Sequence, residues 1–132
     1  MNLFNSAKVL DFTSQYHHGC GIDNLLQRDP SICWFSSAYA PLPQHIDFEL
    51  QKVSKITQIG LFLHGENNQN PKVIKFYAKI QNEWQVITSQ TLTQRPGEWI
   101  FDVQAESQFL RYEILENYGG SGSYTTLLMA YE

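Results

Sequence analysis

Short segments in which apolar and polar residues alternate recur along this chain, and no other feature of the sequence constrains the fold as strongly. In residues 73–80, Ile74, Phe76 and Ala78 alternate with lysines and a tyrosine, and residues 109–115 repeat the pattern. Successive side chains of a β-strand point to opposite faces of the sheet, so such segments predict strands with one buried face. No stretch has the sustained period of an amphipathic helix. The pattern therefore predicts an all-β fold.

The alternating segments are short, and turn-forming residues separate them. Glycine, proline and asparagine occupy the turns at 65–71, 95–97 and 117–123. Many short strands at this spacing are typical of a β-sandwich or jelly roll, which we expect to form a single domain over residues 1–132. The predicted strands are residues 6–13, 45–50, 55–63, 73–80, 84–89, 98–103, 109–115 and 125–131.

The composition supports a packed core and argues against a polyanionic partner. Hydrophobic residues make up 42% of the chain, which is too many for a disordered protein. The net charge is −4, so the sequence offers no basic surface for nucleic acid or an anionic membrane. Lys75 and Lys79 share the predicted strand face opposite Phe76 and Ala78. We expect these lysines to face solvent rather than to bind phosphate.

Residues 1–12 contain neither a basic segment nor a continuous apolar core, so we expect that they are not a signal peptide, although a processed mature chain could have lost one. No apolar run reaches the roughly 18 residues of a membrane-spanning helix. Cys20 and Cys33 are therefore expected to be free thiols in a reducing compartment, and the protein is expected to be cytoplasmic.

The stretch from Ile22 to Leu50 combines a turn, a tryptophan and an alternating strand. A helical turn is expected at 22–28, before a proline-containing corner at 29–31. Trp34 is expected in the core. In the strand at 45–50, the isoleucine, phenylalanine and leucine are expected to face the core and the two acidic residues to face solvent.

Several short motifs follow one another in order between residues 7 and 131. They are Asn24-Leu25-Leu26, Asp29-Pro30-Ser31, Trp34, Ile46–Leu50, Ile56–Leu63, Phe76–Trp84, Phe109-Leu110-Arg111-Tyr112 and Leu127–Tyr131. In this order and spacing they resemble the discoidin, or coagulation-factor type C, domains, which belong to the galactose-binding-domain-like group. The resemblance implies a single β-sandwich of the jelly-roll type, and it covers nearly the whole chain.

The resemblance raises the question of calcium, because many sugar-binding members of the family hold a structural calcium ion at the turn before the tryptophan. In this sequence Gln27 and Ile32 stand where those members have ligands. Asp29 is the one anionic candidate left, whereas calcium prefers about six to eight oxygen ligands. We expect no bound metal or cofactor and keep Asp29 as a weak calcium candidate.

A zinc site is not expected either. Zinc in proteins takes three or four protein ligands in a tetrahedral arrangement. His17 and His18 are adjacent and point apart on an extended chain, while His45 and His64 are isolated in the sequence.

No catalytic group of residues is recognisable. A Cys20–His18 pair has no third residue to orient the base. The paired acidic residues at 47/49 and 113/116 are expected on exposed faces rather than in a cleft. The glycine-rich run 119–122 lacks the lysine and helix of a phosphate-binding loop and is expected to be a flexible loop. The chain is therefore not expected to be an enzyme.

In jelly rolls of this family, ligands meet the loops at one end of the sandwich. The matching loops here are residues 15–21, 36–43, 65–71 and 117–124. Tyrosine rings beside amide side chains suit a protein interface or stacking against a sugar, although the tyrosines of the last loop would equally well pack over the end of the sandwich. The candidate partner-binding residues are Tyr16, His17, His18, Tyr39, Asn67, Asn68, Asn70, Tyr118 and Tyr124.

Two functions follow from the resemblance. The chain is similar to small members of the family without a signal peptide, such as the intraflagellar transport subunit with this fold and the Doc-type domain of the anaphase-promoting complex. This similarity implies an intracellular protein-interaction module, or a small subunit of a larger ciliary or cytoskeletal assembly. The alternative is a carbohydrate-binding module that uses the loop end of the sandwich.

Overall fold

The computed structural model describes residues 1–15, 25–26, 34–63 and 68–132, and nearly all of its regular structure is β-strand. A short 3₁₀ turn, η1, precedes the first strand. The elements are η1 (Leu3–Ser6), β1 (Lys8–Phe12), β2 (Trp34–Phe35), β3 (Gln44–Leu63), β4 (Pro71–Ile80), β5 (Glu83–Thr91), β6 (Gly97–Asn117), β7 (Tyr124–Thr125) and β8 (Leu127–Tyr131). The all-β prediction is therefore confirmed.

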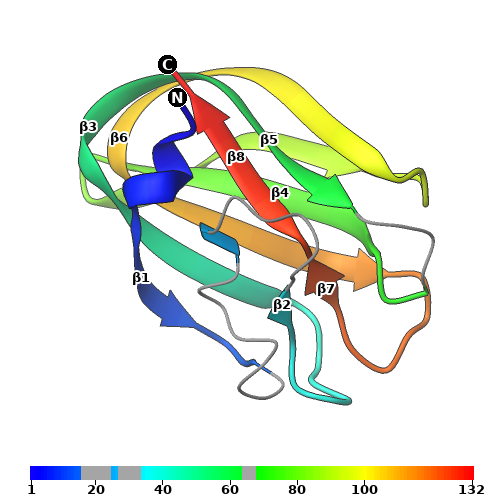
Figure 1. Ribbon diagram of the computed structural model, residues 1–132. Helices are drawn as coiled ribbons and strands as arrows, with labels where there is room; N and C mark the ends of the chain where they lie inside the picture. The colour runs from blue at the N-terminus through cyan, green and yellow to red at the C-terminus, as the bar shows by residue number, and fades with distance from the viewer. Residues whose placement is uncertain (16–24, 27–33, 64–67) are drawn as a thin grey trace.

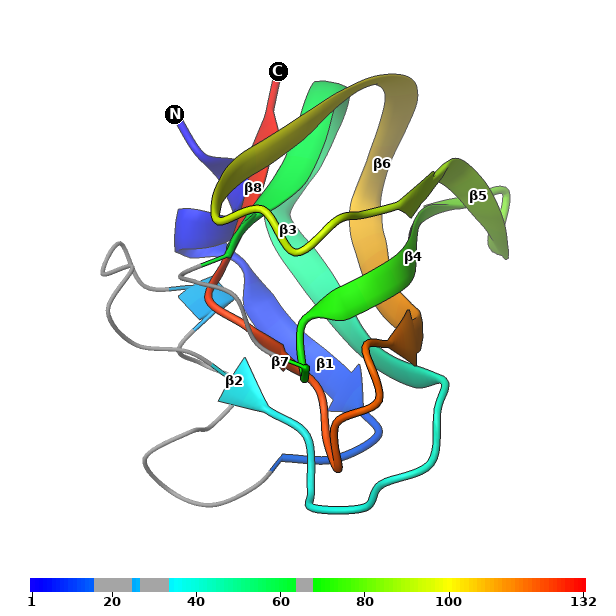
Figure 2. The same ribbon diagram turned by 90° about the vertical axis from the view of Figure 1, so that its right-hand side faces the viewer.

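The strands form one large antiparallel sheet that curls into a sandwich (Figure 1). Its order is β1-β3-β6-β4-β5, and β8 pairs with the second half of β3. The long strands β3 and β6 both arch over one end of the molecule (Figure 2), so their two halves lie in opposite layers. A separate two-stranded ladder, β2 with β7, lies at the other end, near the loops. This is the jelly-roll sandwich expected from the sequence.

Two pairs of predicted strands turn out to be single long strands. Residues 45–50 and 55–63 both belong to β3, and residues 98–103 and 109–115 both belong to β6. The pairing of β3 with β6 is interrupted by a register shift between Glu49 and Ser54, where the strands bend from one layer into the other. The exposed residues at this bend break the alternation, which is why the sequence predicts two strands where the backbone continues as one.

The core contains the apolar residues that the alternation assigns to it. Ile46 and Phe48 are fully buried on β3, as are Phe76 and Ala78 on β4, while Lys75 and Lys79 lie on the opposite face as predicted. Trp34 is also fully buried, which confirms its predicted place. Each fully buried isoleucine or phenylalanine side chain contributes about 1.5–3 kcal/mol to folding.

Gly60 permits a close approach of β3 to β6. A Cβ atom at this position would lie 1.9 Å from the backbone oxygen of Trp99. Any larger residue would force the two strands apart, so glycine is required here by the packing of the backbones.

The two chain termini lie side by side at the end of the sandwich opposite the loops (Figures 1 and 2). The Asn2 side chain joins them, since its amide donates to the backbone oxygen of Leu128 and its oxygen accepts from the Ala130 N–H at 3.0 Å. Within the described part of the chain, no helix is long and apolar enough to cross a membrane.

Candidate functional site

Hydrogen bonds hold the described parts of the predicted loops together at one end of the sandwich. The Ser36 N–H donates to the Ser123 oxygen at 2.8 Å, and the Ser123 N–H donates to Ser36 Oγ at 2.9 Å. The Gly120 N–H donates to the Asn68 oxygen at 3.0 Å, and Ser37 Oγ donates to the Gln15 oxygen at 3.0 Å. Each of the four predicted loops therefore contributes to one continuous surface. We call the described residues of 36–43, 68–71 and 117–124 the loop-end surface.

The glycine-rich loop is tied down rather than free. Asn117 Nδ2 donates to the backbone oxygens of Gly120 and Gly122, and its Oδ1 accepts from the Gly119 N–H at 2.9 Å. A Cβ on Gly120 would lie 2.9 Å from the Asn68 side chain, so the loop needs a glycine there to approach its neighbour. An asparagine at the start of a loop can satisfy several backbone groups in this way. The expectation that this loop is flexible stays a prediction.

Tyr39 is the most exposed aromatic side chain among the described residues, with 84% of its surface accessible. Its backbone has φ of +60°, a conformation that costs a tyrosine about 1–2 kcal/mol. The Tyr39 N–H donates to the Ser121 oxygen at 2.5 Å, which holds this conformation in place. The ring is thus presented to solvent by a backbone that is itself fixed.

The other predicted tyrosines of the loop end have partners within the fold. The Tyr124 ring is buried and stacks on Phe35 with ring centroids 5.4 Å apart. The Tyr118 hydroxyl donates to the Leu92 backbone oxygen, and the Lys72 ammonium lies 5.6 Å from its ring centre. Tyr124 therefore packs within the fold and does not contact a ligand. The hydroxyl and one side of the ring of Tyr118 are already in contact with other residues, so only part of this side chain can contact a ligand.

The predicted asparagines divide in the same way. Asn70 is fully buried, so it supports the loop and does not reach solvent, whereas Asn68 is exposed beside Gly120. Tyr16, His17, His18, Asn67 and the weak calcium candidate Asp29 lie outside the described residues, as do both cysteines and His64. Their predicted roles stay predictions, as does the expectation that no calcium binds.

The outer face of the sheet is a second concentration of polar and aromatic side chains, and it corrects one prediction. Asp47 was expected to face solvent, yet it is only 7% exposed. Arg111 of β6 covers it, donating from Nε to Oδ1 at 2.6 Å and from Nη2 to Oδ2 at 2.9 Å. This bond to Asp47 raises the pKa of Arg111 above its usual value. A strand face that looks solvated in sequence is thus closed by a long side chain from its neighbour.

The aromatic residues of this outer face are also engaged. The Arg111 guanidinium lies 4.7 Å from the ring centre of Trp84, and the Lys79 ammonium lies 5.6 Å from the same ring. The Tyr77 hydroxyl donates to Glu113 Oε1 at 2.5 Å. Burial, and then this hydrogen bond, raise the pKa of Tyr77 to about 12. We call Asp47, Tyr77, Trp84, Arg111 and Glu113 the outer-face network.

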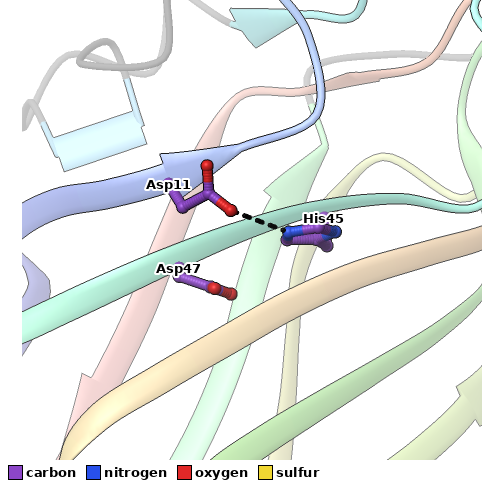
Figure 3. A group of neighbouring side chains, drawn as sticks. All are labelled: Asp11, His45 and Asp47. Carbon is purple, nitrogen blue, oxygen red and sulfur yellow. Dashed lines mark hydrogen bonds and ion pairs between the residues drawn. The ribbon is translucent and has the colours of Figure 1, made fainter.

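A further group at the edge of the sheet was missed by sequence reasoning. His45 Nε2 lies 3.5 Å from Asp11 Oδ2, and Asp47 lies beside them (Figure 3). His45 and Asp47 share a face of β3 by simple alternation, which the sequence does show. Asp11 comes from β1, where a register shift between Val9 and Asp11 decides the pairing, and the sequence carries no signal for that shift.

The fold and its loop end define a discoidin-like jelly roll. The family model of the F5/8 type C domain matches residues 9–127, and the chain belongs to this family. The resemblance stated from the sequence is therefore confirmed. No curated protein sequence matches the chain.

Solved structures with the same fold include several carbohydrate-binding modules. The family 32 module of Streptococcus pneumoniae EndoD superposes with a TM-score of 0.85 at 19% identity, covering 100% of this chain and 99% of that one. The family 32 module of Clostridium perfringens NanJ, in complex with galactose, has a TM-score of 0.86 at 16% identity and coverages of 98% and 96%. Chitosan-binding module 2 of a Paenibacillus chitosanase/glucanase, in complex with chitotriose, has a TM-score of 0.84 at 16% identity and coverages of 99% and 100%. At these identities the likeness shows the fold.

Proposed function

We propose that this domain is a carbohydrate-binding module and that the loop-end surface is its glycan site. The observation that carries the proposal is Tyr39, an exposed ring on a fixed and strained backbone. Strained conformations persist where surrounding contacts impose them, and they cluster at ligand sites. An exposed aromatic ring offers the apolar face on which the C–H groups of a sugar pack.

The charge of the site points to a neutral sugar. The described residues of the loop-end surface include no aspartate, glutamate, lysine or arginine, and the ammonium of the neighbouring Lys72 lies over the Tyr118 ring. They supply hydroxyls, amides and backbone groups, with Asn68 and Ser121 exposed near the loop tips. Such groups match the hydroxyls and acetamides of uncharged hexoses and N-acetylhexosamines, whereas sulfated or phosphorylated ligands need cations.

The fold comparisons support the same ligand class. Three modules with this fold carry ligands in their crystals, namely N-acetylgalactosamine-β-1,3-galactose, galactose and chitotriose. They favour the carbohydrate alternative over the protein-interaction module that the sequence led us to expect first. Nothing in the described residues adds support for the assembly-subunit role or its ciliary and cytoplasmic setting.

A glycan array followed by titration calorimetry tests the proposal. The probes are galactose, N-acetylgalactosamine-β-1,3-galactose and chitotriose. We expect binding of at least one of them, loss of that binding in Tyr39→Ala, and retention in Tyr39→Phe, which keeps the ring. Val53→Ala is the surface control, because Val53 is 57% exposed at the bend of β3.

An array without hits, or binding that survives Tyr39→Ala, contradicts the proposal. In the first case, capture of a protein partner from native lysate by the wild type and not by Tyr39→Ala would move the function to protein docking.

A further inference from the structure

We propose that Asp11, His45 and Asp47 form a zinc-binding site at the edge of the sheet, distinct from the loop-end surface. Each residue offers one ligand atom, and these atoms all lie within 4.8 Å of one another. Figure 3 shows the Asp11 carboxylate and the His45 ring facing each other, with the Asp47 carboxylate alongside. Two neighbouring strands supply them, since Asp11 is paired with Asp47 in the β1–β3 ladder.

The spacing of the first two ligands fits a tetrahedral ion. Zinc holds imidazole nitrogen and carboxylate oxygen at about 2.0–2.2 Å, which places two ligands of a tetrahedron about 3.4 Å apart. The observed separation of His45 Nε2 and Asp11 Oδ2 is 3.5 Å. An ordinary N–H···O hydrogen bond would bring these atoms to about 2.9 Å. The separation of His45 and Asp11 is therefore compatible with an ion bound between them.

Asp47 provides the third ligand while its orientation is fixed from the other side. Arg111 takes up one position on each of the two Asp47 oxygens. A carboxylate has about four acceptor positions, so two remain. Such outer partners commonly hold a metal-binding carboxylate in place. The positive guanidinium also repels a cation, and we therefore expect micromolar rather than nanomolar affinity.

The ligand chemistry and exposure decide which ion can bind. One imidazole with two carboxylates suits zinc, whereas calcium and magnesium favour oxygen ligands alone. The Asp11 side chain is 69% exposed, so an ion reaches it from solvent and the side chain can turn to close the remaining distance to Asp47. A bound zinc ion would join the edge strand β1 to β3, because its ligands come from both.

Titration calorimetry with zinc chloride at pH 7.5 tests the site. We expect one ion per chain, a melting temperature that rises with zinc concentration, and no such rise with calcium chloride. His45→Asn and Asp11→Asn should each weaken zinc binding at least about tenfold. In the presence of a chelator, both variants should melt at the same temperature as the wild type. Asp11 is exposed, and asparagine in place of His45 keeps a polar side chain at that position.

The double variant His17→Asn/His18→Asn is the matched control, since it removes two imidazoles that lie outside the described residues. It should bind zinc as the wild type does. Absence of zinc binding by the wild type overturns the proposal. So does undiminished binding in His45→Asn or Asp11→Asn, or loss of binding in the double control variant.

Discussion

The loop-end surface and the outer-face network both concentrate tyrosine and polar residues, yet they use them in opposite ways. In the outer-face network, Trp84 is covered by cations and Tyr77 donates to Glu113. At the loop end, backbone groups and small side chains make the connections between loops, and the ring of Tyr39 stays 84% exposed. The aromatic side chains of the outer-face network contact other residues of the fold, whereas the Tyr39 ring of the loop-end surface is free to contact a ligand.

This difference explains why the outer face is the weaker binding candidate despite its richer chemistry. A ligand there would have to displace contacts that already satisfy Arg111 and Asp47. The free energy lost by breaking such charge-assisted bonds is larger than the free energy gained from the exposed contacts of a sugar. At the loop end a ligand displaces only solvent from Tyr39.

The largest effect is expected where the loop end rests on the core. Trp34→Ala should lower the free energy of unfolding by about 3–5 kcal/mol, because the indole is fully buried and its N–H donates to the Ser14 oxygen at 3.0 Å. Denaturant unfolding measures this loss. A loss below about 1 kcal/mol would show that the loop end does not depend on this anchor.

Breaking the ion pair of the outer-face network should lower the free energy of unfolding by less than Trp34→Ala does. Asp47→Ala leaves the Arg111 guanidinium without its partner, and about 2–3 kcal/mol of stability should be lost, below the value of about 3–5 for a fully buried pair. Glu83→Ala removes a carboxylate from the exposed first residue of β5 and is the control, expected within about 0.5 kcal/mol of the wild type. Equal effects of the two changes would mean that the network is only a surface feature.

Tyr39 should show the reverse relation between stability and binding. Asparagine tolerates positive φ better than tyrosine does, so Tyr39→Asn should raise the free energy of unfolding by about 0.5–1 kcal/mol. The same change removes the ring and should abolish glycan binding. If Tyr39→Asn instead destabilises the fold, the ring has a structural role that its exposure does not reveal.

The smallest effect is expected at alkaline pH, where the ionisation of Tyr77 in the outer-face network changes the stability of the fold. Burial and the bond to Glu113 raise the pKa of Tyr77 to about 12, whereas an unfolded tyrosine titrates near 10. Because the folded pKa is the higher one, this contribution is complete below about pH 10 and is lost as the pH rises towards 12.

Denaturant midpoints between pH 9 and 11 should therefore fall less steeply in Tyr77→Phe than in the wild type. Tyr39→Phe, which removes an exposed hydroxyl, should leave the slope unchanged. Identical slopes in all three proteins would place Tyr77 outside the network.

Alternation alone predicts much of this fold, because burial on a sheet follows the parity of positions along the strand. Phe76 and Ala78 on one side and Lys75 and Lys79 on the other needed no further information. Burial of Asp47 could not be predicted in this way. It depends on Arg111, which lies 64 residues away in the chain and reaches Asp47 only through the register of β3 and β6.

The candidate site shows the same division. The sequence places tyrosines and asparagines in the correct loops, since turn residues mark those loops clearly. It does not separate Tyr39 from Tyr124, because one ring turns out to solvent and the other stacks on Phe35. Only the hydrogen bonds between loops, such as that from Tyr39 to Ser121, decide which ring is presented.

Chemical-shift mapping of the backbone amides during titration with a glycan that the array selects tests the central claim most directly. If the loop end is the site, the shifts concentrate at residues 37–40, 68–70 and 118–123, and the amides of Tyr77, Trp84 and Arg111 stay in place. Shifts that concentrate on the outer-face network, with the loop-end amides unchanged, would contradict the assignment of the glycan site.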